Sequence, residues 1–183
     1  MKIGTRSLVF GVHQFIWHPI TVYLAWVNLY GKPTWKEIVC ILVHDWGYFG
    51  KPNMDGEEGL KHPELGAWLA SKICGPEYHD LILGHSRFYS KINGKEISKL
   101  CWADKLSIKY DPWWLYLLRA NLSGELEEYR ENASISGFVK REESHRFWFK
   151  KLKELLVEQS KIEGKKYGDK LIDSSKTELN CSI

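Results

Sequence analysis

The stretch IVCILVHDWGY, residues 38–48, is a run of apolar side chains that ends in the adjacent pair His44 and Asp45. Thr34 and Glu37 precede it with the spacing of a capping box, which marks a helix N-terminus. The pattern therefore predicts a helix that is apolar on nearly all sides and lies at the centre of the fold. A buried segment that presents an imidazole beside a carboxylate is typical of a metal site. Taken alone, the dipeptide also fits a core histidine with satisfied hydrogen bonds beside a capping aspartate.

The composition is that of one globular domain. The chain has 183 residues, is 44% hydrophobic and contains nine Trp, which excludes a disordered protein. A net charge of only +3 does not indicate nucleic-acid binding. The four cysteines, Cys40, Cys74, Cys101 and Cys181, show no CxxC spacing. We expect reduced thiols in a cytoplasmic protein.

One uncharged stretch is long enough to span a bilayer. Residues 7–31 contain no Asp, Glu, Lys or Arg. However, His13, Gln14, His18 and other polar or helix-breaking residues interrupt it, and each polar group is costly in lipid. We therefore expect no membrane span.

Helical periodicity and helix start and stop signals recur along the whole chain, and no strand signal competes with them. The predicted fold is all-α, a single compact helical bundle over residues 1–160, followed by a polar, flexible tail at 161–183. The expected helices cover approximately residues 19–31, 34–45, 62–74, 76–85, 96–108, 112–122, a short acidic segment from 123 or 124, and 136–159. Residues 47–61 contain four glycines and a proline, so they are predicted to be a functional loop.

Side chains with metal-binding chemistry occur at the ends of, or within, five different predicted helices. They are His18, His44, Asp45, His62, His85 and Asp104. A packed bundle can direct such residues at one point, and imidazole with carboxylate suits Fe, Mn, Co or Zn, and also Mg. His13 lies five residues before His18 and is an alternative ligand. His79 and His145 occur in ordinary surface or amphipathic settings.

The order H…HD…H…H…D resembles the HD-domain metal-dependent phosphohydrolase superfamily over approximately residues 13–110, with C-terminal helices at 112–160. The resemblance rests on His18 with Val22 and Ala25, on HDWG at 44–47, HPELGA at 62–67, His85, and ADKLS at 103–107. It implies a helical bundle of the HD-domain type with two divalent metal ions. The implied ligands of the first ion are His18, His44, Asp45 and Asp104. Asp45 then bridges to a second ion held by His62 and His85.

The segment HPELGA is similar to that of the HD-GYP phosphodiesterases. After His85, however, the chain reads SRFYSKINGKE, which lacks the second histidine and the GYP signature of that branch. Cyclic di-GMP is therefore not the expected substrate.

The resemblance implies a hydrolase that uses a metal-bridged hydroxide, with Asp45 as the bridging residue, to cut a phosphate ester. We expect a small phosphorylated substrate, a nucleotide in the first instance, so that the enzyme is a nucleotidase or phosphodiesterase. Cationic side chains near the site are expected to contact phosphate oxygens, Arg87 first, then Lys51, Lys61 and Lys105. Each of these lysines also fits a solvated surface role.

Other polar and aromatic residues near the ligands have two interpretations each. Asp55, Glu57 and Glu58 fit a general acid or a solvated acidic loop. The aromatic residues that flank the ligands fit either nucleobase stacking or core packing. These are Trp46, Tyr48, Phe49, Phe88 and Tyr89.

Two other classes of function fit the same residues. The ligand order also resembles that of mixed-valent di-iron oxygenases, typified by myo-inositol oxygenase and an organophosphonate-cleaving relative, in which the metal pair activates dioxygen. A non-catalytic helical binding module is the third class, and it predicts that binding survives loss of the ligands. The C-terminal tail is a candidate contact between subunits of a homo-oligomer.

Overall fold

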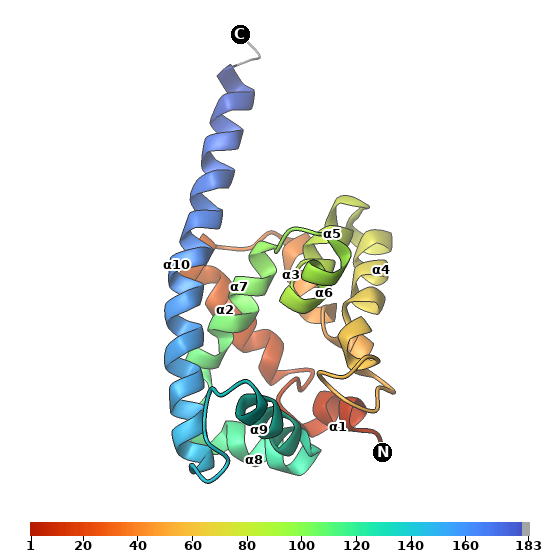
Figure 1. Cartoon of the computed structure of the whole chain (residues 1–183). Coiled ribbons are helices and arrows are strands. Elements are labelled where there is room, and N and C mark those ends of the chain that lie inside the picture. Colours follow the sequence, from red (N-terminus) through yellow and green to blue (C-terminus); the bar gives the residue numbers. More distant parts are fainter. Residues whose placement is uncertain (181–183) are drawn as a thin grey trace.

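The computed structural model describes the backbone of residues 1–180 and the side chains of residues 1–167. Over these residues the chain forms ten α-helices, three short 3-10 helices and no strands, which confirms the predicted all-α fold (Figure 1). The α-helices are α1 Ile3–Phe10, α2 Trp17–Tyr30, α3 Trp35–Val43, α4 Pro63–Cys74, α5 Glu77–Leu83, α6 Arg87–Asn93, α7 Lys99–Ser107, α8 Trp113–Ser123, α9 Glu125–Ile135 and α10 His145–Asn180. The 3-10 helices are η1 Trp46–Tyr48, η2 Gly59–Lys61 and η3 Ile108–Tyr110. The sequence predicted no helix at α1 or α6.

Helix α3 begins at the predicted capping box. The Thr34 hydroxyl accepts the Glu37 amide at 3.3 Å, and the Glu37 carboxylate accepts the Thr34 amide at 2.7 Å. The helix ends at Val43, so that His44 and Asp45 follow its last turn. One part of the expectation is wrong, because the Leu42 side chain is 46% exposed and α3 is not enclosed on all sides.

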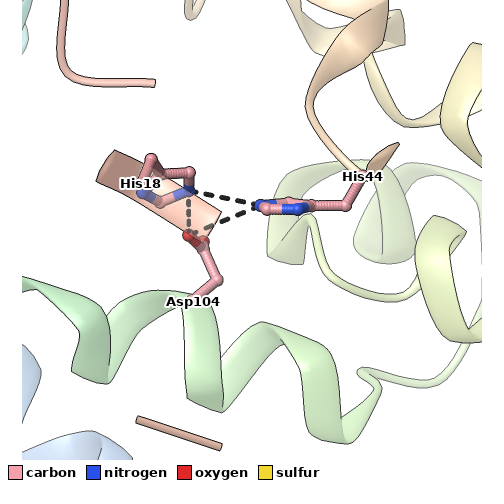
Figure 2. A group of neighbouring side chains, drawn as sticks. All are labelled: His18, His44 and Asp104. Atoms are coloured by element: carbon pink, nitrogen blue, oxygen red, sulfur yellow. Dashed lines mark hydrogen bonds and ion pairs between the residues drawn. The ribbon is translucent and has the colours of Figure 1, made fainter. Parts of the chain in front are cut away.

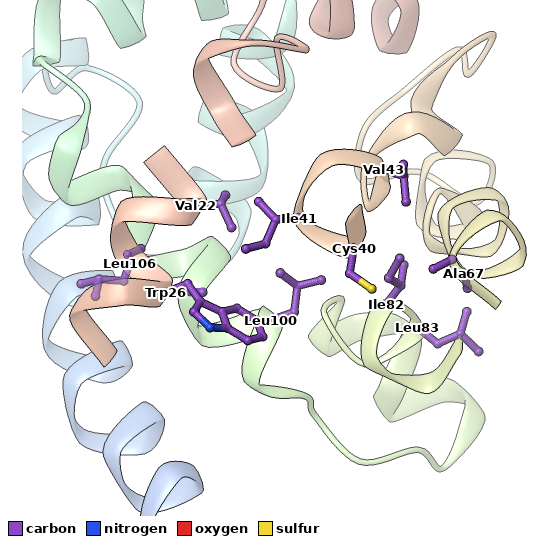
Figure 3. Close-up of a cluster of buried hydrophobic side chains, with 13 residues drawn as sticks. Val22, Trp26, Cys40, Ile41, Val43, Ala67, Ile82, Leu83, Leu100 and Leu106 are labelled. Carbon is purple, nitrogen blue, oxygen red and sulfur yellow. The ribbon is translucent and has the colours of Figure 1, made fainter. Parts of the chain in front are cut away.

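The larger hydrophobic core holds α3 against four other helices. Its buried side chains come from α2, α3, α4, α5 and α7 and include Val22, Trp26, Ile41, Ala67, Ile82, Leu100 and Leu106 (Figure 3). Burial of an aliphatic side chain of this size contributes about 1.5 to 3 kcal/mol. This core fixes the five helices relative to one another, and they are the helices that carry or adjoin the predicted ligands.

A second core joins the C-terminal helices. Tyr116 and Ala120 of α8, Leu126 of α9, and Trp148 and Phe149 of α10 are buried together. Helix α10 runs beside α2 and α7, with α8 and α9 packed near its N-terminal end (Figure 1). The C-terminal helices thus cover one side of the larger hydrophobic core, through the contacts of α10 with α2 and α7.

The C-terminal helices differ from the prediction in two ways. The predicted helix at 136–159 is wrong at its start, because residues 136–144 form turns, with Gly137 at a φ of +70°. The boundary predicted at residue 160 lies inside α10, which continues to Asn180. A Cβ on Gly164 would lie 3.1 Å from Leu29 and 3.3 Å from Trp102, so α10 packs closely on α2 and α7 beyond that boundary. The side chains of 168–180, and all of 181–183, lie outside the part of the tail that is described.

None of the helices described is long and apolar enough to cross a membrane. The uncharged stretch at 7–31 is divided between the end of α1 and α2 by a break at residues 11–16. Cys40, Cys74 and Cys101 are buried and free.

Candidate metal centre

The six predicted ligands meet at one place. His18 lies in the first turn of α2, His44 and Asp45 follow the end of α3, His62 precedes the first residue of α4, His85 follows α5, and Asp104 lies within α7. All of them are buried except Asp104, which is partly buried. The ends of α2, α3, α4 and α5 converge there because the hydrophobic core packs these helices together.

Three of these side chains form a first group. The Nε2 atom of His18 lies 3.2 Å from Nε2 of His44 and 3.2 Å from Oδ1 of Asp104 (Figure 2). The distance from His44 Nε2 to Asp104 Oδ1 is 4.0 Å. Potential ligand atoms of His18, His44 and Asp104 all lie within 4.8 Å of one another, so this group can hold one metal ion.

Asp45 lies between this group and a pair of histidines. Its Oδ2 atom is 3.1 Å from His18 Nε2 and 3.2 Å from His44 Nε2. Its Oδ1 atom is 3.3 Å from His85 Nε2 and 3.6 Å from His62 Nε2, and these two nitrogens are 3.0 Å apart. His44, Asp45 and His85 also form a set that can hold an ion, so His44 lies within reach of both sides. We assign His44 to the first group because its Nε2 atom is 3.2 Å from that of His18. The two oxygens of one carboxylate thus face two different groups of imidazoles.

Backbone carbonyl groups fix the orientation of three of the histidines. The Nδ1 atom of His44 lies 2.8 Å from the carbonyl of Ile41, that of His62 lies 2.8 Å from Gly59, and that of His85 lies 2.5 Å from Ile82. A carbonyl oxygen only accepts, so Nδ1 carries the proton in each ring and Nε2 of the neutral imidazole carries a lone pair. The Nε2 lone pairs of His62 and His85 then face each other at 3.0 Å, which favours a cation between them.

The charges of the cluster also favour a cation. Burial lowers the pKa of His18, but the nearby carboxylates of Asp104 and Asp45 outweigh burial and raise this pKa to about 10. Burial raises the pKa of Asp45, but the neighbouring histidines, His44 first, lower it well below the ordinary value of 3.8. The buried Oδ2 atom of Asp45 has no hydrogen-bond partner of acceptable geometry, although it lies 3.1 Å from His18 Nε2. The unprotonated Nε2 atoms of His44, His62 and His85 and the unpartnered buried oxygen of Asp45 fit divalent metal ions well.

Two glycines allow the ligand-bearing segments to approach closely. A Cβ on Gly47 would lie 1.9 Å from the carbonyl oxygen of His62. A Cβ on Gly66 would lie 2.5 Å from the carbonyl oxygen of Val43 and 3.0 Å from that of His44. Any larger residue at either position therefore forces apart the backbones that carry His44 and His62.

The cluster opens into a pocket of about 240 Å³. Its lining includes four predicted ligands and is completed by His13, Tyr48, Met54, Asp55, Leu60, Ser86, Arg87, Phe88 and Lys105. The Lys105 ammonium donates to Oδ2 of Asp104 at 2.8 Å. Burial raises the pKa of Asp104, but the charge of Lys105 lowers it well below 3.8. Lys105 and Arg87 are thus the predicted cationic residues that line the pocket.

The other two predicted lysines do not line the pocket. Lys51 pairs with Glu58 at 3.5 Å, and Lys61 pairs with Glu57 and Glu58 at 3.6 and 3.8 Å. Their ammonium groups are engaged by carboxylates of the loop that carries them. Asp55 of the same loop lines the pocket.

The flanking aromatic residues divide between pocket and surface. Tyr48 stacks on His62, with ring centroids 4.0 Å apart and planes at 11°, and Phe88 lines the pocket. Trp46 and Phe49 are exposed, and Tyr89 lies 3.5 Å from Glu64. His79 is exposed beside Asp80, and His145 begins α10 away from the cluster.

A buried carboxylate beside the cluster was missed by sequence reasoning. Glu125 is 3.1 Å from Nδ1 of His13, also binds the Ser7 hydroxyl, and accepts the Val12 amide at 2.9 Å. The Nδ1 atom of His13 is thus engaged by Glu125, and His18, not His13, belongs to the first group that can hold an ion. Helix α9 begins with ELEE, which resembles a solvated acidic turn, so no local signal separates Glu125 from its neighbours.

No protein-family model, no curated protein and no solved structure matches the chain. The resemblance to the HD-domain superfamily therefore depends on the residues of the motif alone.

Proposed function

We propose that this chain is a metal-dependent phosphohydrolase of the HD-domain type that holds two divalent transition metal ions and hydrolyses a phosphate ester. The observation that carries the proposal is the position of Asp45. Its two oxygens face two groups of imidazole nitrogens, and one of the oxygens is buried without a hydrogen-bond partner. A carboxylate between two such groups has the geometry of a bridging ligand.

The cationic side chains of the pocket support an anionic substrate. Lys105 and Arg87 line the same pocket as Asp45, and they can neutralise and orient the oxygens of a phosphate group. Lys105 also keeps Asp104 ionised through their contact at 2.8 Å. This charge arrangement supports an anionic substrate such as a phosphate ester.

The chain contributes binding and orientation to the reaction. His18, His44, Asp45 and Asp104 would hold one ion, and Asp45 with His62 and His85 the other. Two bound ions would activate water and polarise the phosphoryl group. The carbonyls of Ile41, Gly59 and Ile82 hold the imidazoles in their ligating tautomer. Burial of the cluster excludes bulk water from all sides except the pocket.

The proposed substrate is a small phosphorylated molecule, with nucleotides as the first class to be tested. Buried free thiols at Cys40, Cys74 and Cys101 support a cytoplasmic location.

Metal content and turnover, measured together, test the proposal. Protein purified without oxygen is analysed for metals and then assayed with Mn, Co, Mg or Fe on nucleotides, phosphodiesters and simple phosphate monoesters. We expect two ions per chain and metal-dependent phosphate ester hydrolysis, both lost in Asp45→Ala. The matched control is Asp80→Ala, because Asp80 is an exposed aspartate paired with Lys95 at 2.8 Å, away from the cluster.

Three results would contradict the proposal in different ways. Two irons per chain with oxygen-dependent turnover and no hydrolysis would establish the oxygenase. Absence of bound metal under every condition would exclude both enzymes. Hydrolysis that survives in Asp45→Ala would exclude Asp45 as the bridging ligand.

A further inference from the structure

A second cavity of about 760 Å³ adjoins the metal pocket. The two share Asp55, Arg87 and Phe88 in their linings, so they are neighbouring compartments of one site. The metal pocket, at about 240 Å³, is smaller than the roughly 300 to 1,000 Å³ of ordinary ligand pockets. It accommodates a phosphate group and a few attached atoms, whereas the adjoining cavity has the volume for a larger organic group.

The second cavity is lined mainly by apolar and aromatic side chains of α8, α9 and α10. These include Tyr116, Tyr129, Trp148, Leu152 and Leu155, and they are joined by Phe138 of the turn between α9 and α10 and by Phe88 of α6. Several of them belong to the second hydrophobic core, which forms the floor of the cavity. A ligand group placed there gains free energy by leaving water.

Four of the polar side chains of this cavity bind one another in pairs. Asn132 donates to Asp55 at 2.9 Å, and Arg87 donates to Gln159 at 3.3 Å. A sugar or a nucleobase needs several free donors and acceptors, and an unmatched polar group is costly to bury. The lining therefore suits an alkyl or aryl group better than a nucleoside.

Arg87 lies between the two compartments and lines both, so a substrate that spans them would pass it. Its guanidinium extends from α6 to Gln159 of α10 and lines both compartments. A phosphate near the metal ligands would place its organic group past Arg87 and Phe88. The charged side of the substrate then meets the cationic residues, and its apolar side meets α8, α9 and α10.

We propose that the substrate is a phosphate ester with an apolar alkyl or aryl group, and that this group occupies the cavity between α8, α9 and α10. The proposal rests on the proposed function only for the position of the phosphate. It narrows the proposed small phosphorylated substrate to a class of ester that is more hydrophobic than a nucleotide.

Binding calorimetry on the metal-loaded protein tests this assignment without turnover. The probes are methylphosphonate, octylphosphonate and adenosine 5′-monophosphate. We expect octylphosphonate to bind at least tenfold more tightly than methylphosphonate, and more tightly than the nucleotide. Leu155→Asp should weaken octylphosphonate at least tenfold and leave methylphosphonate unchanged. Leu155 is 37% exposed, so the charge does not threaten folding, and thermal melting checks this.

Ile162→Asp is the matched control. Ile162 is 50% exposed on the same helix and does not line the cavity. It should change the affinity of neither phosphonate. Equal binding of the two phosphonates, or equal loss in both variants, would overturn the apolar subsite while leaving the phosphohydrolase in place. Tightest binding of the nucleotide would assign the cavity to a nucleoside instead. Failure of both phosphonates to bind metal-loaded protein would remove the phosphate site and this inference with it.

Discussion

Asp45 and Glu125 are both buried carboxylates, at 6% and 0% exposure, yet their surroundings differ in one respect. Glu125 is surrounded by donors, because it accepts the Val12 amide at 2.9 Å and the Ser123 hydroxyl at 2.8 Å, and it also binds Ser7 and His13. Asp45 faces imidazole nitrogens, and its Oδ2 atom has no hydrogen-bond partner of good geometry.

This difference separates a structural carboxylate from a binding one. The contacts of Glu125 are complete within the protein, and they join the N-terminal segment to the start of α9. Those of Asp45 are not completed by the three histidines whose Nδ1 protons bind backbone carbonyls, namely His44, His62 and His85. A buried carboxylate with saturated hydrogen bonds stabilises a fold, whereas an unpartnered oxygen supports the proposed binding of an ion.

The largest effect is expected from removal of the charge of Asp45. In Asp45→Asn, hydrolysis should fall by more than about a hundredfold, because even residues that only orient a metal ligand cost ten- to a hundredfold. Metal content should fall with it. The melting temperature of the metal-free protein should change little, because the new amide can donate to the imidazoles while His18 keeps its contact with Asp104. Elemental analysis measures the metal content, and calorimetry measures the melting temperature. An Asp45→Asn variant that retains both ions would refute the bridging role of Asp45.

The opposite pattern is expected for Glu125→Gln. This change removes the charged acceptor of a buried network and should lower the free energy of unfolding by about 1.5 to 3 kcal/mol, while metal content is retained. Denaturant unfolding at pH 7 measures the loss. Equal stability of the variant and the wild type would show that the network adds nothing.

The stabilities of the wild type and of Glu125→Gln should also depend differently on pH. Burial raises the pKa of Glu125, but the hydrogen bond and charge of His13 and the contacts with Ser7 and Val12 lower it below the ordinary 4.5. A depressed folded-state pKa stabilises the protein above pH 4.5, and this contribution is lost as the pH falls through the folded-state pKa. The wild type should therefore lose stability more steeply than Glu125→Gln below pH 4.5. Parallel acid unfolding curves would contradict this assignment.

The smallest effect is expected on KM, and it distinguishes Lys105 from Lys51, for which the sequence alone allows the same two interpretations. Lys105→Gln should raise the KM for a phosphate ester about tenfold, since a hydrogen bond to a charged group is worth about 1.5 to 3 kcal/mol. Lys51→Gln should leave KM unchanged, because its ammonium pairs with Glu58 outside the pocket. Steady-state kinetics at fixed metal concentration decides between them, and equal effects of the two changes would exclude the anion-binding role of Lys105.

The sequence predicted what depends on local signals. The capping box of Thr34 and Glu37 locates the start of α3, and the end of the apolar run locates His44 and Asp45. Once the helices are known, an ordered set of histidines and aspartates at their ends predicts one site. Convergence of these residues follows from ordinary helix packing around a hydrophobic core.

The features that the sequence did not predict depend mainly on contacts between distant parts of the chain. Glu125 meets Ser7 across 118 residues, and the second cavity is formed by α8, α9 and α10 where they pass the metal pocket. The turns at 136–144 were missed because apolar residues in that segment continue the helical pattern of α10. Gly137 has a φ of +70°, a left-handed backbone conformation that interrupts a helix and that the periodicity of apolar residues does not reveal.

The close approach at Gly47 and Gly66 also bears on which ions the site accepts. With no side chain between the backbones that carry His44 and His62, main-chain contact fixes the spacing of the two imidazole groups. We expect the proposed metal site to select by ionic radius, because backbones in such close contact cannot move apart to fit a larger ion. Ions with ligands at about 2.0 to 2.2 Å should be accepted, and Ca²⁺, which prefers about 2.3 to 2.6 Å and more oxygen ligands, should be rejected.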